Sequence, residues 1–218
     1  MKKIKKAAIS STVAIALTLP LLSGCFFGAA AALTTSTLAA SDRRTVGTQV
    51  EDRTIQLKAT NIISGDFGDT VHVNVTVYNR HMLLTGEAPD ENTRRRVEGS
   101  VSNIPNLRLV TNDVKIAGNS SLTSRTNDTL LTTKVKASLL DAQDVFGNAF
   151  KVTTEAGSVY LMGLVTEREA DRAAQIAAGV SGVTRVVKVI DPISEAELKT
   201  MTATPNTNSN PDSDSNVR

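Results

Sequence analysis

The pattern of apolar and polar positions in the first half of the chain predicts a small module of helices and strands. Apolar side chains recur at helical spacing over residues 50–63 and then at every second position over residues 71–77, which indicates a helix followed by a half-buried strand. A second strand is predicted over residues 82–88. The Pro-Asp-Glu sequence at residues 89–91 is typical of a helix start, and residues 107–116 form the predicted closing strand. The predicted order is helix, strand, strand, helix, strand.

The second half of the chain repeats this module at an offset of about 76 residues. Three segments match in register: DRTIQLK (52–58) with DTLLTTK (128–134), MLLTG (82–86) with VYLMG (159–163), and IPNL (104–107) with VSGV (180–183). The second copy has predicted helices over residues 129–140 and 168–178, and predicted strands over residues 149–155, 159–165 and 184–190. The sequence therefore predicts two domains, residues 48–117 and 127–191, joined by a linker of residues 118–126.

We expect an α+β fold in which each domain has the order αββαβ, with two helices on one face of a small three-stranded mixed sheet. The connection from the second to the third strand makes that pair parallel and the crossover right-handed. A domain of this size buries only a marginal core, so we expect the two copies to pack together. Residues 192–218 are polar and lack apolar periodicity, which predicts a disordered tail.

The first 25 residues have the features of a bacterial export signal. Four lysines within the first six residues precede an uncharged apolar stretch of about 16 residues, shorter than the roughly 20 of a membrane-spanning helix. The sequence Leu-Ser-Gly-Cys at residues 22–25 resembles a lipobox, which predicts removal of residues 1–24, acylation of Cys25 and a tether over residues 25–47. Acyl chains on Cys25 would anchor the protein in a membrane. Because Phe26 rather than aspartate follows the cysteine, we expect the outer membrane, with the domains facing the periplasm.

Composition restricts the possible chemistry. The chain has 218 residues with one cysteine, two histidines and 3% aromatic residues, which disfavours disulfides, cysteine-rich metal sites and aromatic platforms for nucleic acid. Removal of the signal takes four of 24 basic side chains and no acidic one, leaving 20 against 22, so no global attraction to nucleic acid is expected. His72 and His81 are expected at the surface without a metal. The sequence has no GxSxG, SxxK or phosphate-binding glycine motif, and no catalytic residue is predicted.

Both copies resemble the BON domain. The resemblance is carried by DTLLTTKV (128–135), VYLMGLVTEREA (159–170) and SGV (181–183) in the second copy, and by LLTG (83–86) and IPNL (104–107) in the first. Together with the lipobox and tether, this tandem over about residues 48–191 is similar to the dual-BON outer-membrane lipoproteins. The resemblance implies a role without catalysis or cofactor, binding of anionic phospholipids such as phosphatidylglycerol and cardiolipin, and support of outer-membrane integrity around the division site.

The resemblance places the phospholipid contact on the first helix of the second copy, residues 129–140. On a helical wheel with Leu131 facing the core, the outward and flanking positions combine apolar and basic side chains. These positions are Leu130, Thr133, Lys134, Lys136, Ala137 and Leu140. Apolar side chains suit the headgroup boundary of a bilayer, and ammonium groups suit its phosphates.

Two other interpretations of this face stay open. The outward residues form an ordinary solvated surface, or they pack against the first domain. The protein is alternatively an adaptor that docks an envelope protein through residues 129–140 or through the basic run at residues 94–96, for example in support of peptidoglycan remodelling, with the lipid serving only as an anchor.

Two glycines match glycines of the family pattern. Gly86 and Gly163 each lie in the predicted second strand of their copy. We interpret both as fold residues, where the missing side chain lets a helix approach the sheet, rather than as ligand contacts.

Overall fold

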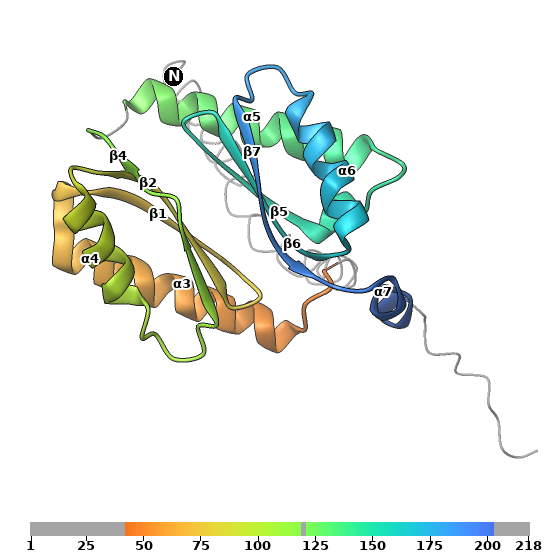
Figure 1. Ribbon diagram of the computed structural model, residues 1–218, viewed down its shortest axis with the longest axis horizontal. Helices are drawn as coiled ribbons and strands as arrows, with labels where there is room; N and C mark the ends of the chain where they lie inside the picture. The colour runs from red at the N-terminus through yellow and green to blue at the C-terminus, as the bar shows by residue number, and fades with distance from the viewer. Residues whose placement is uncertain (1–41, 119–120, 203–218) are drawn as a thin grey trace, which may run out of the picture. The chain divides into compact units, whose positions relative to one another are not determined.

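The predicted order of elements occurs twice in the computed structural model, which describes residues 42–118 and 121–202 (Figure 1). The first copy consists of α3 (Val46–Phe67), the 3₁₀ turn η2 (Gly68–Thr70), β1 (His72–Tyr78), β2 (His81–Ala88), α4 (Glu91–Val101), β3 (Leu109–Asn112) and β4 (Lys115–Ile116). The second consists of α5 (Leu122–Asp141), the 3₁₀ turn η3 (Gly147–Ala149), β5 (Phe150–Glu155), β6 (Ser158–Val165), α6 (Glu167–Ala178) and β7 (Arg185–Pro192). The predicted signal peptide, Cys25, the tether up to residue 41 and the tail from residue 203 lie outside the described residues.

Each copy forms a mixed sheet with the predicted topology. In the first, β1 pairs antiparallel with β2, and β2 pairs parallel with β3. In the second, β5 pairs antiparallel with β6, and β6 pairs parallel with β7. The first closing strand is divided in two, because Val114 turns into the core, where it is 1% exposed, before β4 pairs with β2 again. The α+β fold with two αββαβ domains is confirmed.

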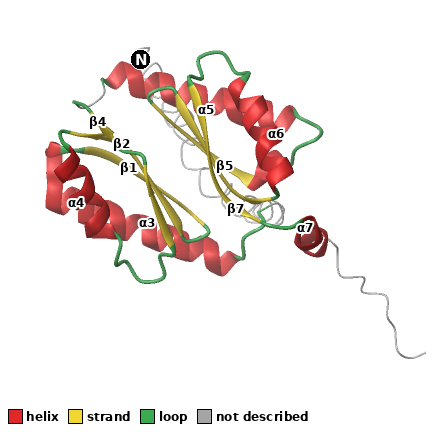
Figure 2. Ribbon diagram, viewed as in Figure 1, coloured by secondary structure: helices red, strands yellow, loops and turns green. Residues whose placement is uncertain are grey.

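The helices of each copy cover one face of their own sheet (Figure 2). The core of the first copy is formed by buried residues of α3, β1, β2 and α4, among which Ala59, Val77 and Val97 are 0% exposed. The core of the second copy is formed in the same way, with Val135 and Leu161 at 0% exposure. Each domain therefore has its own hydrophobic core between helices and sheet.

An aspartate near the start of the first helix stabilises the hairpin of each copy. The Asp52 carboxylate accepts hydrogen bonds from the backbone N–H groups of Asn79 (2.7 Å) and Arg80 (2.6 Å), and both of these residues have positive φ angles. The Asp128 carboxylate accepts equivalent bonds from two residues of the second hairpin, Ala156 and Gly157, at 2.9 Å each. The sequence match between positions 52 and 128 therefore reflects one structural device, a carboxylate that satisfies the N–H groups of a tight turn.

The second faces of the two sheets pack against each other. The described residues from Arg43 onward, 43–118 and 121–202, belong to one compact unit, and a third apolar cluster within it contains residues of both copies. These are Tyr78 and Leu83 of the first sheet and Tyr160, Met162 and Val189 of the second. The strand β2 is consequently buried along its whole length, which is the pattern of a strand covered on both faces. The expectation that the two copies share their burial is met by sheet-on-sheet packing.

Asp191 of β7 is the centre of a polar cluster at this sheet-to-sheet interface. Its carboxylate accepts a hydrogen bond from Asn79 Nδ2 (2.8 Å) and pairs with the guanidinium of Arg108, and His81 Nδ1 lies 3.8 Å away. Burial opposes ionisation of Asp191, but the interactions with His81, Arg108 and Asn79 outweigh it and lower its pKa to about 2. This negative charge therefore links the second copy to three groups of the first.

Further polar contacts cross the same interface. Asp113 accepts a hydrogen bond from the Tyr160 hydroxyl (2.7 Å) and pairs with Arg185. Asn74 Nδ2 donates to Glu155 Oε2 at 2.7 Å. Polar partners across the interface satisfy groups that the packing removes from water.

The capping residues place two helix starts earlier than predicted. Thr45 caps α3 by accepting from Thr48 N (3.1 Å), so the helix begins at Val46 and the tether is shorter than the predicted residues 25–47. Ser121 caps α5 by accepting from Ser124 N (3.2 Å), so this helix begins within the predicted linker. Both starts were missed because the prediction followed apolar periodicity, and the first turn of each helix contains a single large apolar residue and so shows no period.

The prediction of a disordered tail over residues 192–218 is wrong for the first part of this segment, up to Thr202. Helix α7 (Glu195–Thr202) follows β7, and at its first turn the Ser194 hydroxyl and the Glu197 carboxylate accept hydrogen bonds from each other's backbone N–H groups. Arg168 of α6 also pairs with Glu195 at 3.3 Å. A local capping box therefore forms a short helix without an apolar face.

Gly86 and Gly163 are fold residues, but the contact that excludes a side chain differs from the predicted one. A Cβ atom at Gly86, where φ is +111°, would lie 2.0 Å from the carbonyl oxygen of His72 on the neighbouring strand. A Cβ atom at Gly163 would lie 2.9 Å from the carbonyl oxygen of Ala149. The missing side chain therefore makes room for a backbone carbonyl of β1 at Gly86 and of the turn that leads into β5 at Gly163, rather than for one of the α-helices that pack on the sheet.

In the part of the chain that the structure describes, no helix combines the length and the apolar character needed to cross a bilayer.

Replacement of Gly86 by alanine should strongly destabilise the fold. The Gly86→Ala variant combines a positive φ with a backbone clash, and we expect a loss of at least about 2 kcal/mol in the free energy of unfolding, measured by urea denaturation. Gly99→Ala is the control, because a Cβ atom there meets nothing within 4 Å and the helical backbone suits alanine. Equal stability of Gly86→Ala and the wild type would contradict the structure.

The Asp191 carboxylate should stabilise the fold at pH values above 3.8, its pKa in the unfolded chain. This contribution should be lost in acid. Because the folded pKa is lowered to about 2, its contribution is present at pH 7 and disappears as pH falls from about 4 to 2. Asp191→Asn should therefore cost roughly 2 kcal/mol at pH 7, and the difference from wild type should vanish near pH 2. Asp171→Asn, which removes an exposed ion pair with Lys188, should show no comparable change.

Candidate functional site

The outward face of α5 carries the predicted combination of apolar and basic side chains. All six predicted positions are exposed, and Leu130 and Leu140 are the largest apolar groups, with exposed fractions of 57% and 58%. At 100° per residue the six positions span roughly 160° of the helix, with Lys134 at one edge and Lys136 at the other. We refer to Leu130, Thr133, Lys134, Lys136, Ala137 and Leu140 as the α5 face.

Packing on the opposite side fixes the rotation of α5. Leu131, Val135 and Leu139 are buried, and Asp128 binds the β5–β6 hairpin. The Thr132 hydroxyl donates to the Thr154 hydroxyl of β5 at 2.8 Å. Because these contacts determine which side of the helix faces the sheet, the α5 face is presented to solvent by a rigid element.

The polar groups of the α5 face are available for an anionic ligand. Among the described residues, neither Lys134 nor Lys136 forms an ion pair, so both ammonium groups are free to meet phosphate. The Thr133 hydroxyl donates to the backbone carbonyl of Thr129 at 3.0 Å, which satisfies its donor within the helix. The face therefore combines two leucines, an alanine and two unpaired cations, a chemistry suited to the boundary between headgroups and acyl chains.

An exposed aromatic side chain near the end of α5 was missed by the sequence analysis. Phe146 is 42% exposed and directly precedes η3. A Cβ atom at the next residue, Gly147, would lie 2.6 Å from the carbonyl oxygen of Leu139, so this turn packs against the last turn of α5. Phe146 lies in a short turn without periodicity, and its exposure is decided by this packing.

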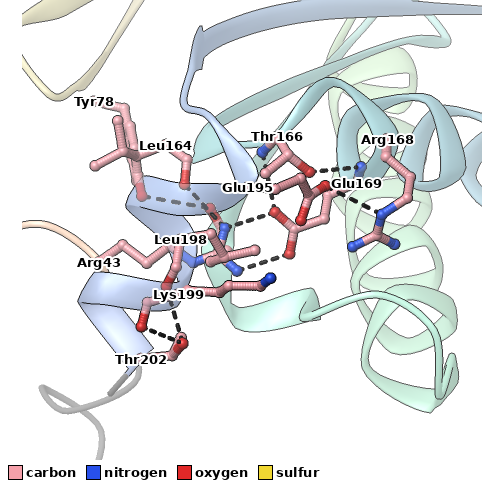
Figure 3. A network of polar contacts seen from close by, with 11 residues as sticks. Arg43, Tyr78, Leu164, Thr166, Arg168, Glu169, Glu195, Leu198, Lys199 and Thr202 are labelled. Carbon is pink, nitrogen blue, oxygen red and sulfur yellow. Dashed lines mark hydrogen bonds and ion pairs between the residues drawn. The ribbon is translucent and has the colours of Figure 1, made fainter. Parts of the chain in front are cut away.

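The two arginines that precede α3 each bind a different copy, and Figure 3 shows the contacts of Arg43. Arg43 donates to Leu164 O (3.1 Å) and forms a two-pronged ion pair with Glu169 of α6 at 2.7 and 2.8 Å. Arg44 pairs with Asp52 of α3 at 2.6 Å and lies over the Tyr78 ring. The chain that comes from the predicted tether is therefore fixed to both copies at residues 43 and 44.

The pair of Arg43 and Glu169 is buried, with side-chain exposures of 7% and 6%. Burial opposes ionisation of Glu169, but hydrogen bonds from Arg43 and from the backbone N–H of Thr166 outweigh it and lower the Glu169 pKa. The Glu169 and Thr166 side chains also form the capping box of α6. The Glu169 carboxylate thus connects Arg43, near the start of the described residues, to the first turn of α6.

The expectation that both histidines lie at the surface is wrong. His81 is 5% exposed, and its Nε2 lies 2.8 Å from the Thr111 hydroxyl. His72 is partly buried, and its Nδ1 lies 2.9 Å from Glu87 Oε2. His72, Glu87 and Glu155 form the one group of potential metal ligands found among the described residues. The three residues are far apart in sequence, so only the fold brings them together.

Comparison with known proteins agrees with the resemblance inferred from the sequence. The family profile of the BON domain matches residues 51–118 and 127–191. The chain is 31% identical over 170 residues to the outer membrane lipoprotein DolP of Haemophilus influenzae, covering 77% of this chain and 88% of that protein. It is 30% identical over 152 residues to a 21 kDa hemolysin of Actinobacillus pleuropneumoniae, covering 69% and 78%.

Among solved structures, the chain is similar to CdsD, a structural protein of the type III secretion system of Chlamydia trachomatis. The match has 12% identity and a TM-score of 0.26, and covers 68% of this chain and 98% of CdsD. A likeness of this degree has no bearing on function.

Loss of the Arg43 charge should destabilise the protein far more than loss of an exposed arginine. Arg43→Met leaves the Glu169 carboxylate buried without its partner, and we expect a loss of about 3 kcal/mol in the free energy of unfolding at pH 7. Arg168→Met is the matched control, because its pair with Glu195 is exposed on both sides and should contribute less than about 1 kcal/mol. Equal effects of the two changes on urea denaturation would contradict the assigned role of Arg43.

Proposed function

Because this chain belongs to the BON family, with two domains of that family, we propose that it is an outer-membrane lipoprotein that faces the periplasm and binds anionic phospholipid through the α5 face. Cys25 is the proposed site of acylation and supplies the permanent anchor. The second BON domain then contacts the bilayer surface, and the protein supports the integrity of the outer membrane, at the division site in particular, without catalysis.

The exposure of the α5 face is the observation that carries this proposal. The interpretation in which the α5 face packs against the first domain is disfavoured, because the domains meet through their sheets and Leu130 and Leu140 stay exposed. Two large apolar side chains on a fixed helix face, bracketed by lysines, favour a membrane ligand over plain solvation. The name of the Haemophilus influenzae relative supports the proposed location.

The expected strength of the contact explains why an anchor is needed. Each lysine near an anionic surface contributes about 1 kcal/mol, and the leucines add partial burial in the headgroup region. This gives weak binding for the isolated domain. An acylated Cys25 keeps the domain next to the bilayer and raises its effective concentration there, so a weak contact suffices to orient it.

A second candidate function is docking of an envelope protein, which one observation favours. Helix α3 exposes Val46, Val50 and Leu57 on one side, with exposed fractions of 67%, 63% and 50%. Beside this helix, a cleft of about 500 Å³ is lined by Lys58, Ile62, Ile104 and neighbouring residues. An adaptor, for example one that supports peptidoglycan remodelling, would use this surface of the first domain and the acyl anchor alone for membrane contact.

A vesicle experiment tests the lipid proposal. A soluble chain beginning at residue 41 should bind vesicles containing phosphatidylglycerol or cardiolipin, fail to bind phosphatidylcholine vesicles, and lose binding as salt rises. The double variant Leu130→Glu/Lys136→Glu should reduce binding at least tenfold in a sedimentation assay, with an unchanged circular dichroism spectrum.

The matched control makes the same two changes on the first helix of the first domain. Leu57 and Lys58 are exposed, so Leu57→Glu/Lys58→Glu should bind vesicles like the wild type. If neither double variant affects vesicle binding, or if no anionic vesicle is bound, the α5 face is not a lipid site. Loss of a protein partner in the α3 variant alone would favour the adaptor.

A further inference from the structure

We propose that His72, Glu87 and Glu155 form a binding site for a divalent transition-metal ion, with Zn²⁺ as the fitting probe, between the two BON domains. One ligand atom from each residue lies within 4.8 Å of the other two. His72 and Glu87 are directly opposite each other in the antiparallel pair β1–β2, and Glu155 ends β5 of the second domain. The ion would therefore join the two domains.

The donor set selects the class of metal. One imidazole nitrogen and two carboxylate oxygens match the ligands of Zn²⁺ and related ions, with a fourth position left for water. Ca²⁺ and Mg²⁺ prefer six or more oxygen ligands and are disfavoured by the imidazole. Bond lengths near 2.0–2.2 Å place ligand atoms about 3.4 Å apart, so small side-chain movements complete the site, including an opening of the 2.9 Å contact between His72 and Glu87.

The charges around the site favour a cation. Glu87 and Glu155 are 5% and 6% exposed, and Asp128 lies in the same cleft. Burial raises the Glu155 pKa, and the nearby charges of Glu87 and Asp128 raise it further, against a hydrogen bond from Asn74. The cationic groups that face this cleft are His72 when protonated, Arg125 and Lys136. A bound dication would neutralise two buried carboxylates that otherwise repel each other.

The surroundings of the ligands also suit a metal. A polar cleft of about 640 Å³ is lined by His72 and Glu155 and gives the ion access from solvent. The described hydrogen bonds of Glu155, from Asn74 (2.7 Å) and Thr85 (3.5 Å), both end on Oε2, so they orient the carboxylate and leave Oε1 for a ligand. Hydrogen bonds of this kind fix metal-ligating carboxylates in known sites.

Metal binding at this site replaces a hydrogen bond between two of the ligands. His72 Nδ1 lies 2.9 Å from Glu87 Oε2, a hydrogen bond that needs a proton on one of the two atoms. The metal takes that position and both groups turn to the ion, while the neutral imidazole carries its one proton on Nε2. Protons compete with metal ions for imidazole and carboxylate ligands, so affinity should fall as pH is lowered.

The full chain, purified in detergent and stripped with a chelator, tests the proposal by titration with ZnCl₂. We expect one Zn²⁺ per chain at pH 7.5 with a dissociation constant of about 10 μM or lower, a rise of several degrees in the unfolding midpoint, and at least tenfold weaker binding at pH 5.5. Glu155→Gln and His72→Ala should each weaken binding at least tenfold. Glu155→Gln preserves the shape of the side chain and guards against loss of fold.

His81→Gln is the matched control, because the chain has only two histidines and this change leaves all three proposed ligands in place. Unchanged Zn²⁺ affinity in His81→Gln, together with loss in the other two variants, locates the site. Absence of binding below 1 mM, affinity unaffected by Glu155→Gln, or loss of binding only in His81→Gln would each overturn it. The vesicle experiment uses variants of Leu130 and Lys136, whereas the metal titration uses variants of His72 and Glu155. A negative result in the metal titration therefore does not contradict the lipid proposal.

Discussion

The packing of the two sheets against each other is the constraint on which the rest of this structure depends. A three-stranded sheet with helices on one face leaves its other face apolar, and neither copy alone has anything to cover it. Tyr78 and Leu83 of the first copy meet Tyr160 and Met162 of the second, so each copy covers the other. The buried Asp191 and its partners from the first copy add electrostatic specificity to this contact. The repeat thus lets two small domains share the burial of their second sheet faces.

This use of the sheets leaves the outer faces of the helices as the surfaces for function. The α5 face is exposed because its opposite side, with Val135 and Leu139, is committed to the core of its own domain. The same packing fixes Arg43 against Glu169 in the second domain and Arg44 against Asp52 in the first. The chain that comes from the proposed anchor is therefore fastened to the pair of domains, which would transmit the position of that anchor to the α5 face.

The interface also explains the polar residues that the sequence analysis misjudged. His72 and His81 lie on the second face of the first sheet, the side that also carries Tyr78 and Leu83. A single domain exposes that face to water, and only docking of the second copy buries His81 and brings Glu155 beside His72 and Glu87. The proposed metal site depends on this docking, since its ligands come from both copies.

The sequence by itself determined the two-fold repeat, the αββαβ order, the inward and outward sides of α5 and the two essential glycines, because periodicity and local residue types specify them. It did not determine where α3, α5 and α7 begin, because caps such as Ser121 follow no apolar period. Three features were decided only by the tertiary structure. They are the close approach of the β1 backbone to Gly86, the exposure of Phe146, and the position of His72 near Glu87 and Glu155. These features arise from contacts between residues far apart in the chain, and a one-dimensional pattern holds no information on such distances.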